Sequence, residues 1–391
     1  MNRLFVGNFD FEHSLAGQFD GQSPAAVTRI LEELSCIWVA CSEAGDVLLM
    51  PQPVDASFFY ELSQAGLPEL KQILKSESVP QNLKLYPWGW TSDLRQWADE
   101  NSLKFHAPQQ AAVRAVNSRR FSFQLEREWN VALPGSAAVT SLDELKAAVQ
   151  NLPEEFDRWV IKAEFSMSAR ERVLGNGREI SVNVRNWTSR RLGTNGVVFF
   201  EPWVDRIEEA GLQFSIPEQG EVEFLGKTTL LTDQAGGYRG SRFSSAQNLQ
   251  GDWAQAVETG FAVASRLQAA GYFGPLGIDA LSYRDASGRA CFRPIQDINA
   301  RYTMGRIALG FRRLLNPGET ASWLQVSQKF TNTAEALCWK EEIQEKVSES
   351  IRILWTSPVE MGSRPVQQQT VLLIGQQESE LNEAEKILFE S

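Results

Sequence analysis

The sequence has 391 residues, 43% of them hydrophobic and 22% charged, which is the composition of a folded globular protein rather than a disordered or fibrous one. One hydrophobic core seldom serves this length, so two or three domains are expected. The net charge of −11, with acidic and basic residues interleaved, argues against nucleic acid as a partner, because an acidic surface without a basic stripe repels a phosphate backbone.

Residues that form disulfides or bind zinc are scarce. The two histidines, His13 and His106, are too few for a zinc site or an HExxH protease. No apolar run approaches the length of a membrane span, and Asp10 and Glu12 come too early for a signal peptide. We therefore expect a cytoplasmic protein that does not associate with membranes. The four cysteines stand outside any CxxC spacing and are expected as free thiols: Cys36, Cys41, Cys291 and Cys338.

The first 110 residues alternate short apolar runs with helical patterns, as an α/β unit does. A turn signal at residues 43–46 separates two of the expected strands, and Pro68 suits the first turn of an expected helix. The expected strands are Leu4–Gly7, Ile37–Ala40 and Val47–Met50, and the expected helices are Ala25–Leu34, Leu67–Leu74 and Ser92–Asn101.

The next part, to about residue 203, combines helices with two strands that each end in a charged residue. Ser141 and Glu144 form the capping box that begins one of the helices. One strand ends in a cation, Lys162, and the other in a carboxylate, Glu201, that precedes a proline. The expected elements are a helix over 111–128, a strand over 159–162, a polar loop over 166–172 and a strand over 197–204.

Beyond residue 204 the alternation of apolar and polar residues indicates antiparallel strands, then a long helix and a hairpin. Apolar residues from Trp253 to Leu267 repeat at helical intervals, and Gly271 suits the end of that helix. Helices are then expected to dominate up to Leu354. The expected strands are Gln213–Ile216, Glu223–Leu231, Ile278–Leu281, Phe292–Asn299 and Thr370–Ile374.

The second strand of the expected hairpin is the most informative stretch. Side chains alternate along a strand, so Asp297, Asn299 and Arg301 are expected on one face. Asp and Asn offer the hard oxygen ligands that Mg²⁺ takes when it is shared with phosphates, and Arg301 could neutralise a transferring phosphoryl group. Asp279, on the preceding strand, could supply a second carboxylate. Taken alone, the stretch could also be a solvated strand face with ordinary polar residues.

Three further groups could serve anions or a nucleotide. Lys162 and the loop after it could cradle a phosphate, although a strand-end lysine that reaches solvent is as common. Glu201, or the backbone beside it, could accept from an adenine amine or a ribose hydroxyl, or could mark a plain turn. Arg239 and Arg242 lie in a glycine-rich segment and could grip a substrate carboxylate or an acyl phosphate, or could be solvated loop arginines.

The order of these pieces resembles the ATP-grasp superfamily. That family combines a basic residue before a helix, a strand lysine, a flexible small-residue loop, a hinge carboxylate and a closing acidic pair of the form D/E … E-x-N-x-R. The likeness covers roughly residues 111–310, and the N-terminal α/β unit suits the domain that precedes the grasp. Here the pattern is carried by Asn117 to Arg120, Lys162, Ser166 to Arg172, Glu201 to Val204, Asp279, and Asp297 to Arg301.

The resemblance implies an α/β fold, α+β in its central part, and a role for each matching residue. Its regions would be 1–110, the N-terminal α/β domain; 111–203, the small or lid subdomain; 204–320, the large subdomain with the metal site; and 321–391, a helical C-terminal extension. The residues implied for the ATP phosphates are Arg119 or Arg120, Lys162, Ser168 and Arg170. Glu201 and Val204 would hold adenine and ribose; Asp279, Asp297 and Asn299 would hold Mg²⁺, with Mn²⁺ as an alternative; and Arg301 would stabilise phosphate charge.

By the same resemblance the chain would be a ligase that activates a carboxylate as an acyl phosphate, releases ADP and joins the acid to an amine, with an amino acid or small metabolite as substrate. The family allows a homodimer. Three departures stand out: arginine at the first cation position, Ala169-Arg170-Glu171 in place of a glycine-rich loop, and Asp297 where Glu is commoner. They leave open a nucleotide-binding or scaffold protein without turnover. A small-molecule kinase on the same fold is a further alternative, which would differ in accumulating a phosphorylated product.

Overall fold

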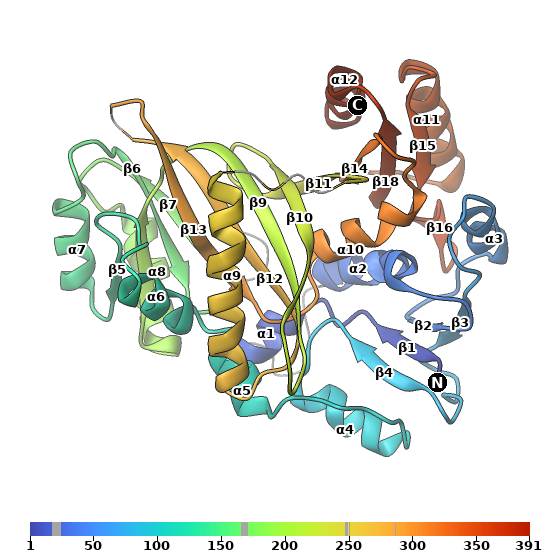
Figure 1. The fold of residues 1–391 in the computed structure, drawn as a ribbon, viewed down its shortest axis with the longest axis horizontal. Coiled ribbons are helices and arrows are strands. Elements are labelled where there is room, and N and C mark those ends of the chain that lie inside the picture. The colour runs from blue at the N-terminus through green and yellow to red at the C-terminus, as the bar shows by residue number, and fades with distance from the viewer. Residues whose placement is uncertain (18–24, 166–170, 247–248, 250, 286) are drawn as a thin grey trace.

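The computed structural model describes residues 1–17, 25–165, 171–246, 249, 251–285 and 287–391. Three parts built on sheets make up the molecule, with a small sheet and an N-terminal α/β unit on either side of a long central sheet (Figure 1). In the described ranges, no helix combines the length and the apolar character needed to cross a membrane.

The N-terminal unit is a parallel four-stranded sheet with helices around it. Its elements are β1 (Arg3–Val6), α1 (Phe11–Ala16), α2 (Ala25–Glu33), the 3₁₀ helix η1 (Leu34–Cys41), β2 (Val47–Met50), α3 (Ala56–Gln64), β3 (Lys71–Leu74), β4 (Lys84–Pro87) and α4 (Ser92–Glu100). The strand order is β3-β2-β1-β4. The two inner strands are apolar and largely buried on both faces, as parallel strands covered by helices are.

Two expectations for this unit are wrong. Residues 37–40 belong to η1 and not to a strand; residues 34–40 are all buried, so their continuous apolar run carries no period that separates helix from strand. Residues 67–74 form no helix, because the chain runs extended into β3, whose backbone pairs in parallel with β2. The neighbouring strand thus overrides the local helical pattern.

The next part is a small antiparallel sheet of order β5-β8-β6-β7 with helices packed on it. Its elements are α5 (Gln110–Val116), α6 (Arg119–Glu128), β5 (Ala137–Val139), α7 (Leu142–Gln150), β6 (Arg158–Ala163), β7 (Arg172–Asn176), α8 (Val182–Asn195) and β8 (Val198–Pro202). The helix expected over 111–128 is two helices, because Ser118 caps α6 by accepting from the backbone N–H of Arg120 at 3.2 Å. Ser141 caps α7 as predicted, accepting from the Glu144 N–H at 3.1 Å.

An eight-stranded antiparallel sheet of order β13-β12-β9-β10-β11-β14-β18-β15 forms the centre of the molecule. Its first elements are β9 (Asp205–Ile216), β10 (Glu223–Thr232), β11 (Tyr238–Ser244), α9 (Asp252–Ala269), β12 (Gly274–Arg284), β13 (Ala290–Asn299), α10 (Met304–Gly310), the 3₁₀ helix η2 (Phe311–Leu314) and β14 (Thr320–Ser327). Helix α9 lies across this sheet (Figure 1), and Gly260 lets it approach, since a Cβ there would stand 2.3 Å from the Phe214 ring.

The C-terminal part contains helices, as expected, but it also extends the central sheet. Its elements are α11 (Thr333–Lys346), β15 (Arg352–Trp355), β16 (Glu360–Met361), β17 (Arg364–Pro365), β18 (Gln368–Gly375) and α12 (Glu378–Glu390). The late strand was predicted, whereas β14 and β15 fall where helices were expected to dominate. Because β18 inserts between these two strands, pairing over long sequence separations determines all three.

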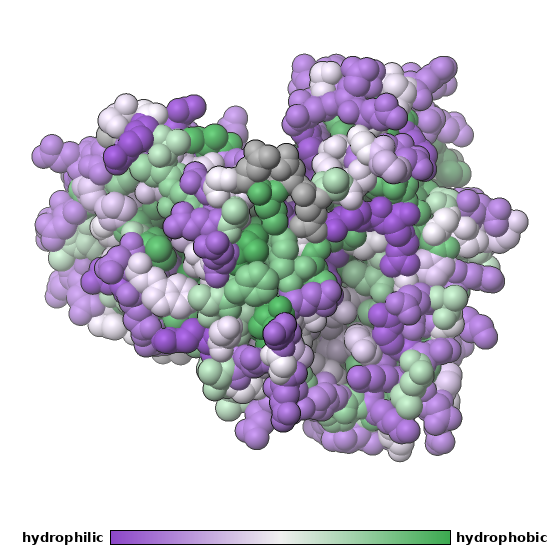
Figure 2. All heavy atoms as spheres, viewed as in Figure 1, coloured by the Kyte–Doolittle hydropathy of each residue, from purple (hydrophilic) through white to green (hydrophobic). Residues whose placement is uncertain are grey.

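One continuous core joins the N-terminal unit to the central sheet. Phe5 and Trp38 belong to the same buried cluster as Phe214 and Trp323 of the central sheet. On the face shown in Figure 2, hydrophilic side chains cover most of the surface. The shared core holds the parts of the molecule together around the cavity that lies between them.

Candidate active site

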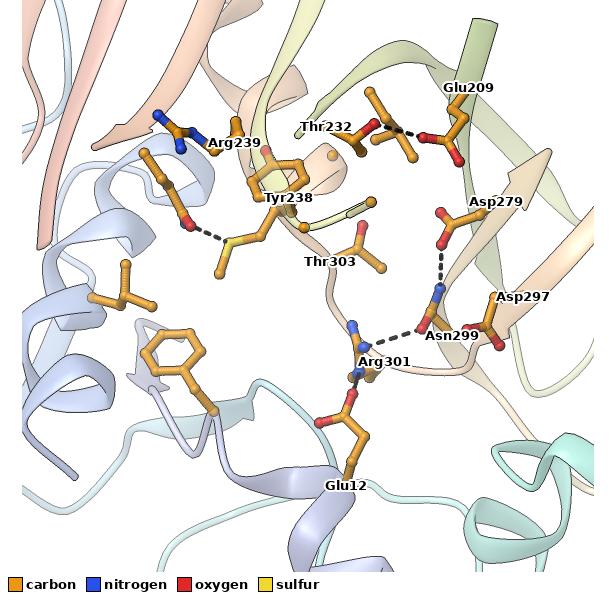
Figure 3. Close-up of a pocket in the computed structure, with 18 of the residues that line it drawn as sticks. Glu12, Glu209, Thr232, Tyr238, Arg239, Asp279, Asp297, Asn299, Arg301 and Thr303 are labelled. Atoms are coloured by element: carbon orange, nitrogen blue, oxygen red, sulfur yellow. Dashed lines mark hydrogen bonds and ion pairs between the residues drawn. The ribbon is translucent and has the colours of Figure 1, made fainter. Parts of the chain in front are cut away.

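A cavity of about 470 Å³ lies where the N-terminal unit, the small sheet and the central sheet meet. Side chains reach it from α1, α2, β6, β7 and seven strands of the central sheet. Figure 3 shows the polar residues around it: Glu12, Glu209, Thr232, Tyr238, Arg239, Asp279, Asp297, Asn299, Arg301 and Thr303. A cavity of this size that gathers polar groups from many elements is typical of a ligand-binding site.

The strands β12 and β13 bring three of the expected ligands together, and we call Asp279, Asp297 and Asn299 the acidic hairpin. Asp279 and Asp297 are direct partners across the two strands, so their carboxylates share one face. The Asn299 amide donates to Asp279 at 3.3 Å. Burial, with repulsion from Asp297 as the next cause, raises the pKa of Asp279 to about 7. A cation placed between the carboxylates would relieve that repulsion.

Arg301 lies just after β13 and faces the same end of the cavity. Its guanidinium donates to the Asn299 side-chain oxygen at 3.0 Å and to the carboxylate of Glu12 on α1. The backbone N–H of Ala300 donates to the Asn117 side chain at 2.9 Å, which ties this segment to the α5–α6 junction. Arg301 therefore sits at the edge of the acidic hairpin in a fixed position, as the alternation in sequence predicted.

Two of the expected phosphate cations lie beside the acidic hairpin. Arg119, at the start of α6, donates to Asp297 at 3.1 Å, and Lys162 of β6 donates to Glu201 at 2.7 Å; both cations line the cavity. Arg120 instead pairs with Glu164 at 3.1 Å, and its side chain is 52% exposed. Of the two neighbouring arginines, the structure therefore places Arg119 at the cavity.

Glu201 and Val204 lie near the cavity without lining it. Val204 is buried in the core of the small sheet. Glu201 accepts from Lys162 at 2.7 Å and from Arg293 of β13 at 3.0 Å, and Arg293 also donates to Glu126 of α6 at 2.6 Å. We call Glu126, Lys162, Glu201 and Arg293 the buried ion network. Both Glu201 oxygens accept from these cations, so an adenine or a ribose would share them with Lys162 and Arg293.

Burial and ion pairing act in opposite directions in this network. Burial alone would raise the pKa of Glu201, but Arg293 and Lys162 outweigh it and hold the value below the ordinary range. Burial raises the pKa of Glu126, which has Arg293 as its ion-pair partner. Burial lowers the pKa of Lys162, and Glu201 opposes that shift. The protonation state of each group in the buried ion network therefore depends on the charges of its neighbours.

Comparison with known proteins identifies the fold. The sequence matches no protein-family model and no curated protein. Among solved structures, the N5-carboxyaminoimidazole synthetase of Staphylococcus aureus superposes over 100% of both chains with a TM-score of 0.55 and 10% identity. The match to the N5-carboxyaminoimidazole ribonucleotide synthetase of Thermus thermophilus covers 100% of this chain and 99% of that chain, with a TM-score of 0.54 and 14% sequence identity. The match to biotin carboxylase of Campylobacter jejuni covers 96% of this chain and 87% of that chain, with a TM-score of 0.54 and 11% sequence identity.

These three neighbours are ATP-grasp proteins. The chain has the ATP-grasp fold. The expected fold class is thereby confirmed, including the preceding α/β unit and helices at the C-terminal end. Because the neighbours are at most 14% identical, the likeness concerns the fold, and the chemistry must be argued from this chain's own residues.

The side chains of the acidic hairpin fit an Mg²⁺ site in which phosphates supply further ligands. Among the described residues, no group of three or more Asp, Glu, His or Cys side chains could hold a metal alone. The acidic hairpin offers two carboxylates and one amide oxygen, which suits a cation that takes its remaining ligands from a nucleotide. The donor set is of oxygens throughout, as Mg²⁺ and Mn²⁺ prefer.

The two arginines expected on the substrate side separate in the structure. Arg239 lines the cavity, whereas Arg242 donates to Glu378, Asn382 and Glu385 of α12 at 2.9, 2.5 and 2.6 Å. Arg242 therefore anchors the C-terminal helix and does not reach the cavity. Side chains alternate along β11, so two arginines three residues apart cannot share a face of that strand.

The loop between β6 and β7 is described only in part. Ser168 and Arg170 lie outside the described residues. Glu171 lines the cavity, and its carboxylate pairs with Arg191 of α8, so its negative charge is partly compensated. Arg172 also lines the cavity and lies 5.4 Å from the Trp203 ring centroid.

The sequence patterns did not predict several residues that line the cavity or belong to the buried ion network. Glu12 comes from a helix of six residues far from any motif, and Glu209 lies in the middle of β9. Glu126 has no motif of its own. Arg293 stands four residues before Asp297, so strand alternation could have placed both on the same face. Long-range contacts, which no local pattern shows, bring the other three into place.

Proposed function

We propose that this chain is an ATP-dependent ligase that activates a carboxylate as an acyl phosphate and joins it to an amine. The observation that carries the proposal is the convergence of Asp279, Asp297 and Asn299 with Arg119 and Arg301 at one end of a cavity. Paired carboxylates beside cations suit a metal–nucleotide complex and the charge of a transferring phosphoryl group. The ATP-grasp fold supports the same chemistry by analogy.

The acidic hairpin would hold Mg²⁺, which supplies charge neutralisation across the nucleotide phosphates. Arg119 and Lys162 would bind the phosphates from the small-sheet side, and Arg301 would bind the γ-phosphoryl group. A substrate carboxylate oxygen would then attack the γ-phosphorus, forming an acyl phosphate while the bond to ADP breaks. The amine nitrogen would attack the acyl carbon, and inorganic phosphate would leave.

Glu12 supports the amine half of the proposal. One of its carboxylate oxygens pairs with Arg301, while the other, Oε2, is buried without a hydrogen-bond partner in the described structure. A buried acceptor that lines the cavity suits an N–H group of an incoming amine. Glu12 would thus orient the amine next to the guanidinium that neutralises the phosphate.

One observation favours a second candidate, a nucleotide-binding protein without turnover. Lys162 is paired with Glu201 and Arg119 with Asp297, so a carboxylate already compensates part of the charge that each cation would offer to a phosphate. If they keep their partners, a nucleotide could bind without productive alignment of its γ-phosphate. A small-molecule kinase would differ in leaving a phosphorylated product.

The test is release of ADP from MgATP with pools of carboxylic acids and amines. ADP and inorganic phosphate released only when acid and amine are both present would support the ligase. AMP in place of ADP would contradict it, and a stable phosphorylated acid would indicate the kinase. Binding of MgATP with no release of ADP for any pool would indicate the protein without turnover.

Asp297→Asn should reduce ADP release at least about a hundredfold, because it removes a carboxylate from the proposed Mg²⁺ site. Asp205→Asn is the matched control, since Asp205 is an exposed carboxylate on β9 outside the cavity. Equal activity of the two variants would show that the acidic hairpin does not serve the reaction.

A further inference from the structure

One part of the cavity lining is apolar. It includes five side chains that we call the apolar wall: Phe9, Ile30, Leu31, Leu34 and Trp88. The wall reaches the acidic hairpin side at Trp88, because the Arg301 guanidinium lies 5.6 Å from the Trp88 ring centroid. Phe9, Leu34 and Trp88 are almost fully buried, and Phe9 packs edge-on against Trp88 with ring centroids 4.9 Å apart. A rigid apolar surface of this kind favours ligand atoms that leave water.

Arg239 of β11 lines the same cavity. Figure 3 shows it across the cavity from Asp279, Asp297 and Asn299. Gly240 pairs with Leu324, so the preceding residue, Arg239, lies beside Gln325 of β14, which also lines the cavity. The Arg239 guanidinium lies 4.5 Å from the Phe389 ring centroid on α12.

Arg239 lacks an anionic partner in the described part of the chain. Arg119, Lys162 and Arg301 each have a carboxylate partner. No described carboxylate forms an ion pair with Arg239 or with Arg172, but the Arg172 guanidinium donates to the backbone carbonyl of Ala235. The Arg239 Nε atom is buried and has no hydrogen-bond partner among the described residues. A buried donor of this kind costs stability unless a ligand supplies an acceptor, and guanidinium groups match carboxylates best.

We propose that the cavity binds a substrate with an apolar body and a carboxylate, with the carboxylate on Arg239 and the body against the apolar wall. The inference rests on the proposed function, because the substrate must also carry the group that the ligase activates. That reacting group would extend from the apolar body toward Arg301. The carboxylate on Arg239 is not the one activated, because Arg239 lies across the cavity from the acidic hairpin (Figure 3). The substrate class is therefore a bifunctional molecule with an apolar middle.

Binding of four related probes tests this assignment without any turnover. The probes are 4-phenylbutyrate, which has body and charge; 4-phenylbutan-1-ol, which lacks the charge; butyrate, which lacks the ring; and 4-phenylbutylamine, which has the opposite charge. Calorimetric titration of the full chain should rank 4-phenylbutyrate first by about tenfold or more over each of the others. Equal binding of butyrate, or tighter binding of the amine, would overturn the proposal.

Two variants separate the charge from the apolar wall. Arg239→Gln should weaken 4-phenylbutyrate about tenfold or more and leave 4-phenylbutan-1-ol unchanged, whereas Arg239→Lys should keep part of the preference for the acid. Leu31→Gln should weaken both probes, and Leu337→Gln, at a residue 47% exposed on α11, is the control that should weaken neither. Unchanged binding of the acid by Arg239→Gln would refute the role of Arg239.

Stability and function are read out separately. Phe389→Leu removes the ring beside Arg239 but keeps the guanidinium. This variant should still bind 4-phenylbutyrate if the guanidinium itself contacts the carboxylate. Thermal unfolding of each variant verifies that it folds. If the probes rank as expected while no acid elicits ADP release, the binding site stands and the proposed ligase fails. If ADP release requires only small polar acids and ignores Arg239→Gln, the ligase stands and this inference fails.

Discussion

Replacing Arg293 with methionine tests how far the buried ion network stabilises the fold. The Arg293, Glu126 and Glu201 side chains are only 2%, 3% and 5% exposed. Arg293 donates to Glu126 at 2.6 and 3.2 Å and to Glu201 at 3.0 and 3.2 Å. Methionine fills much of the same volume but leaves Glu126 with no ion-pair partner in the described ranges, while Glu201 keeps Lys162 at 2.7 Å.

Breaking a buried ion pair from one side costs about 3–5 kcal/mol, because a charge is left in a dry environment. Since Glu201 keeps a second cation, we assign most of this loss to Glu126. Arg293→Met should therefore lower the free energy of unfolding at pH 8 by about 3–5 kcal/mol. Urea titration followed by tryptophan fluorescence and by circular dichroism measures the loss, and agreement of the two probes justifies a single transition.

The pH dependence provides a second measurement. Without Arg293, the pKa of Glu126 rises further above its unfolded value, so the folded variant binds more protons than the unfolded chain at neutral pH. A carboxyl group with a raised folded pKa lowers stability as pH rises, so the loss should be larger at pH 8 than at pH 6. Adding Glu126→Gln should recover at least about 1 kcal/mol, because it removes the stranded charge.

Arg289→Met is the matched control, since its guanidinium is 77% exposed at the end of the same hairpin. It should leave the urea midpoint unchanged. A loss below about 1 kcal/mol for Arg293→Met, with no difference between pH 6 and pH 8, would refute the reasoning that the network is dry and mutually dependent.

Three further predictions concern the C-terminal half of the chain. Burial lowers the pKa of Lys340 from its ordinary 10.5 to about 7, so between these pH values the unfolded chain binds more protons than the folded protein. The free energy of unfolding should therefore rise with pH across that window, by at most about 5 kcal/mol. Lys340→Met should abolish this rise in urea titrations at pH 7 and pH 10. Arg242→Ala removes the donors that hold α12, so it should lower the free energy of unfolding by about 1–3 kcal/mol. Amide hydrogen exchange should become faster in residues 378–390 but not in α11, and equal protection of α12 in both proteins would contradict this. Gly240→Val should lower the melting temperature and cost about 1–3 kcal/mol, because a Cβ there would stand 2.6 Å from the Trp323 carbonyl oxygen; an unchanged melting temperature would show that β11 and β14 can separate.

Local signals in the sequence are enough to predict part of the fold. Ser141 caps α7 because a side-chain oxygen meets a backbone N–H three residues away, and the hairpin of β12 and β13 follows from alternation around a turn. The same alternation placed Asp297 and Asn299 on one face next to Arg301. Ordered motifs of this kind were sufficient to predict the ATP-grasp fold.

Contacts between distant segments determine which charged residues line the cavity and which form ion pairs with one another. Sequence could not separate Arg119 from Arg120, nor show that Glu201 is held by Arg293 while Arg242 holds α12, because these pairs join residues far apart in the chain. The strand at β3 and the 3₁₀ helix η1 were mispredicted for the same reason: backbone partners and burial on all sides come from distant segments. Local spacing encodes which side chains share a face, whereas packing between elements determines what that face meets.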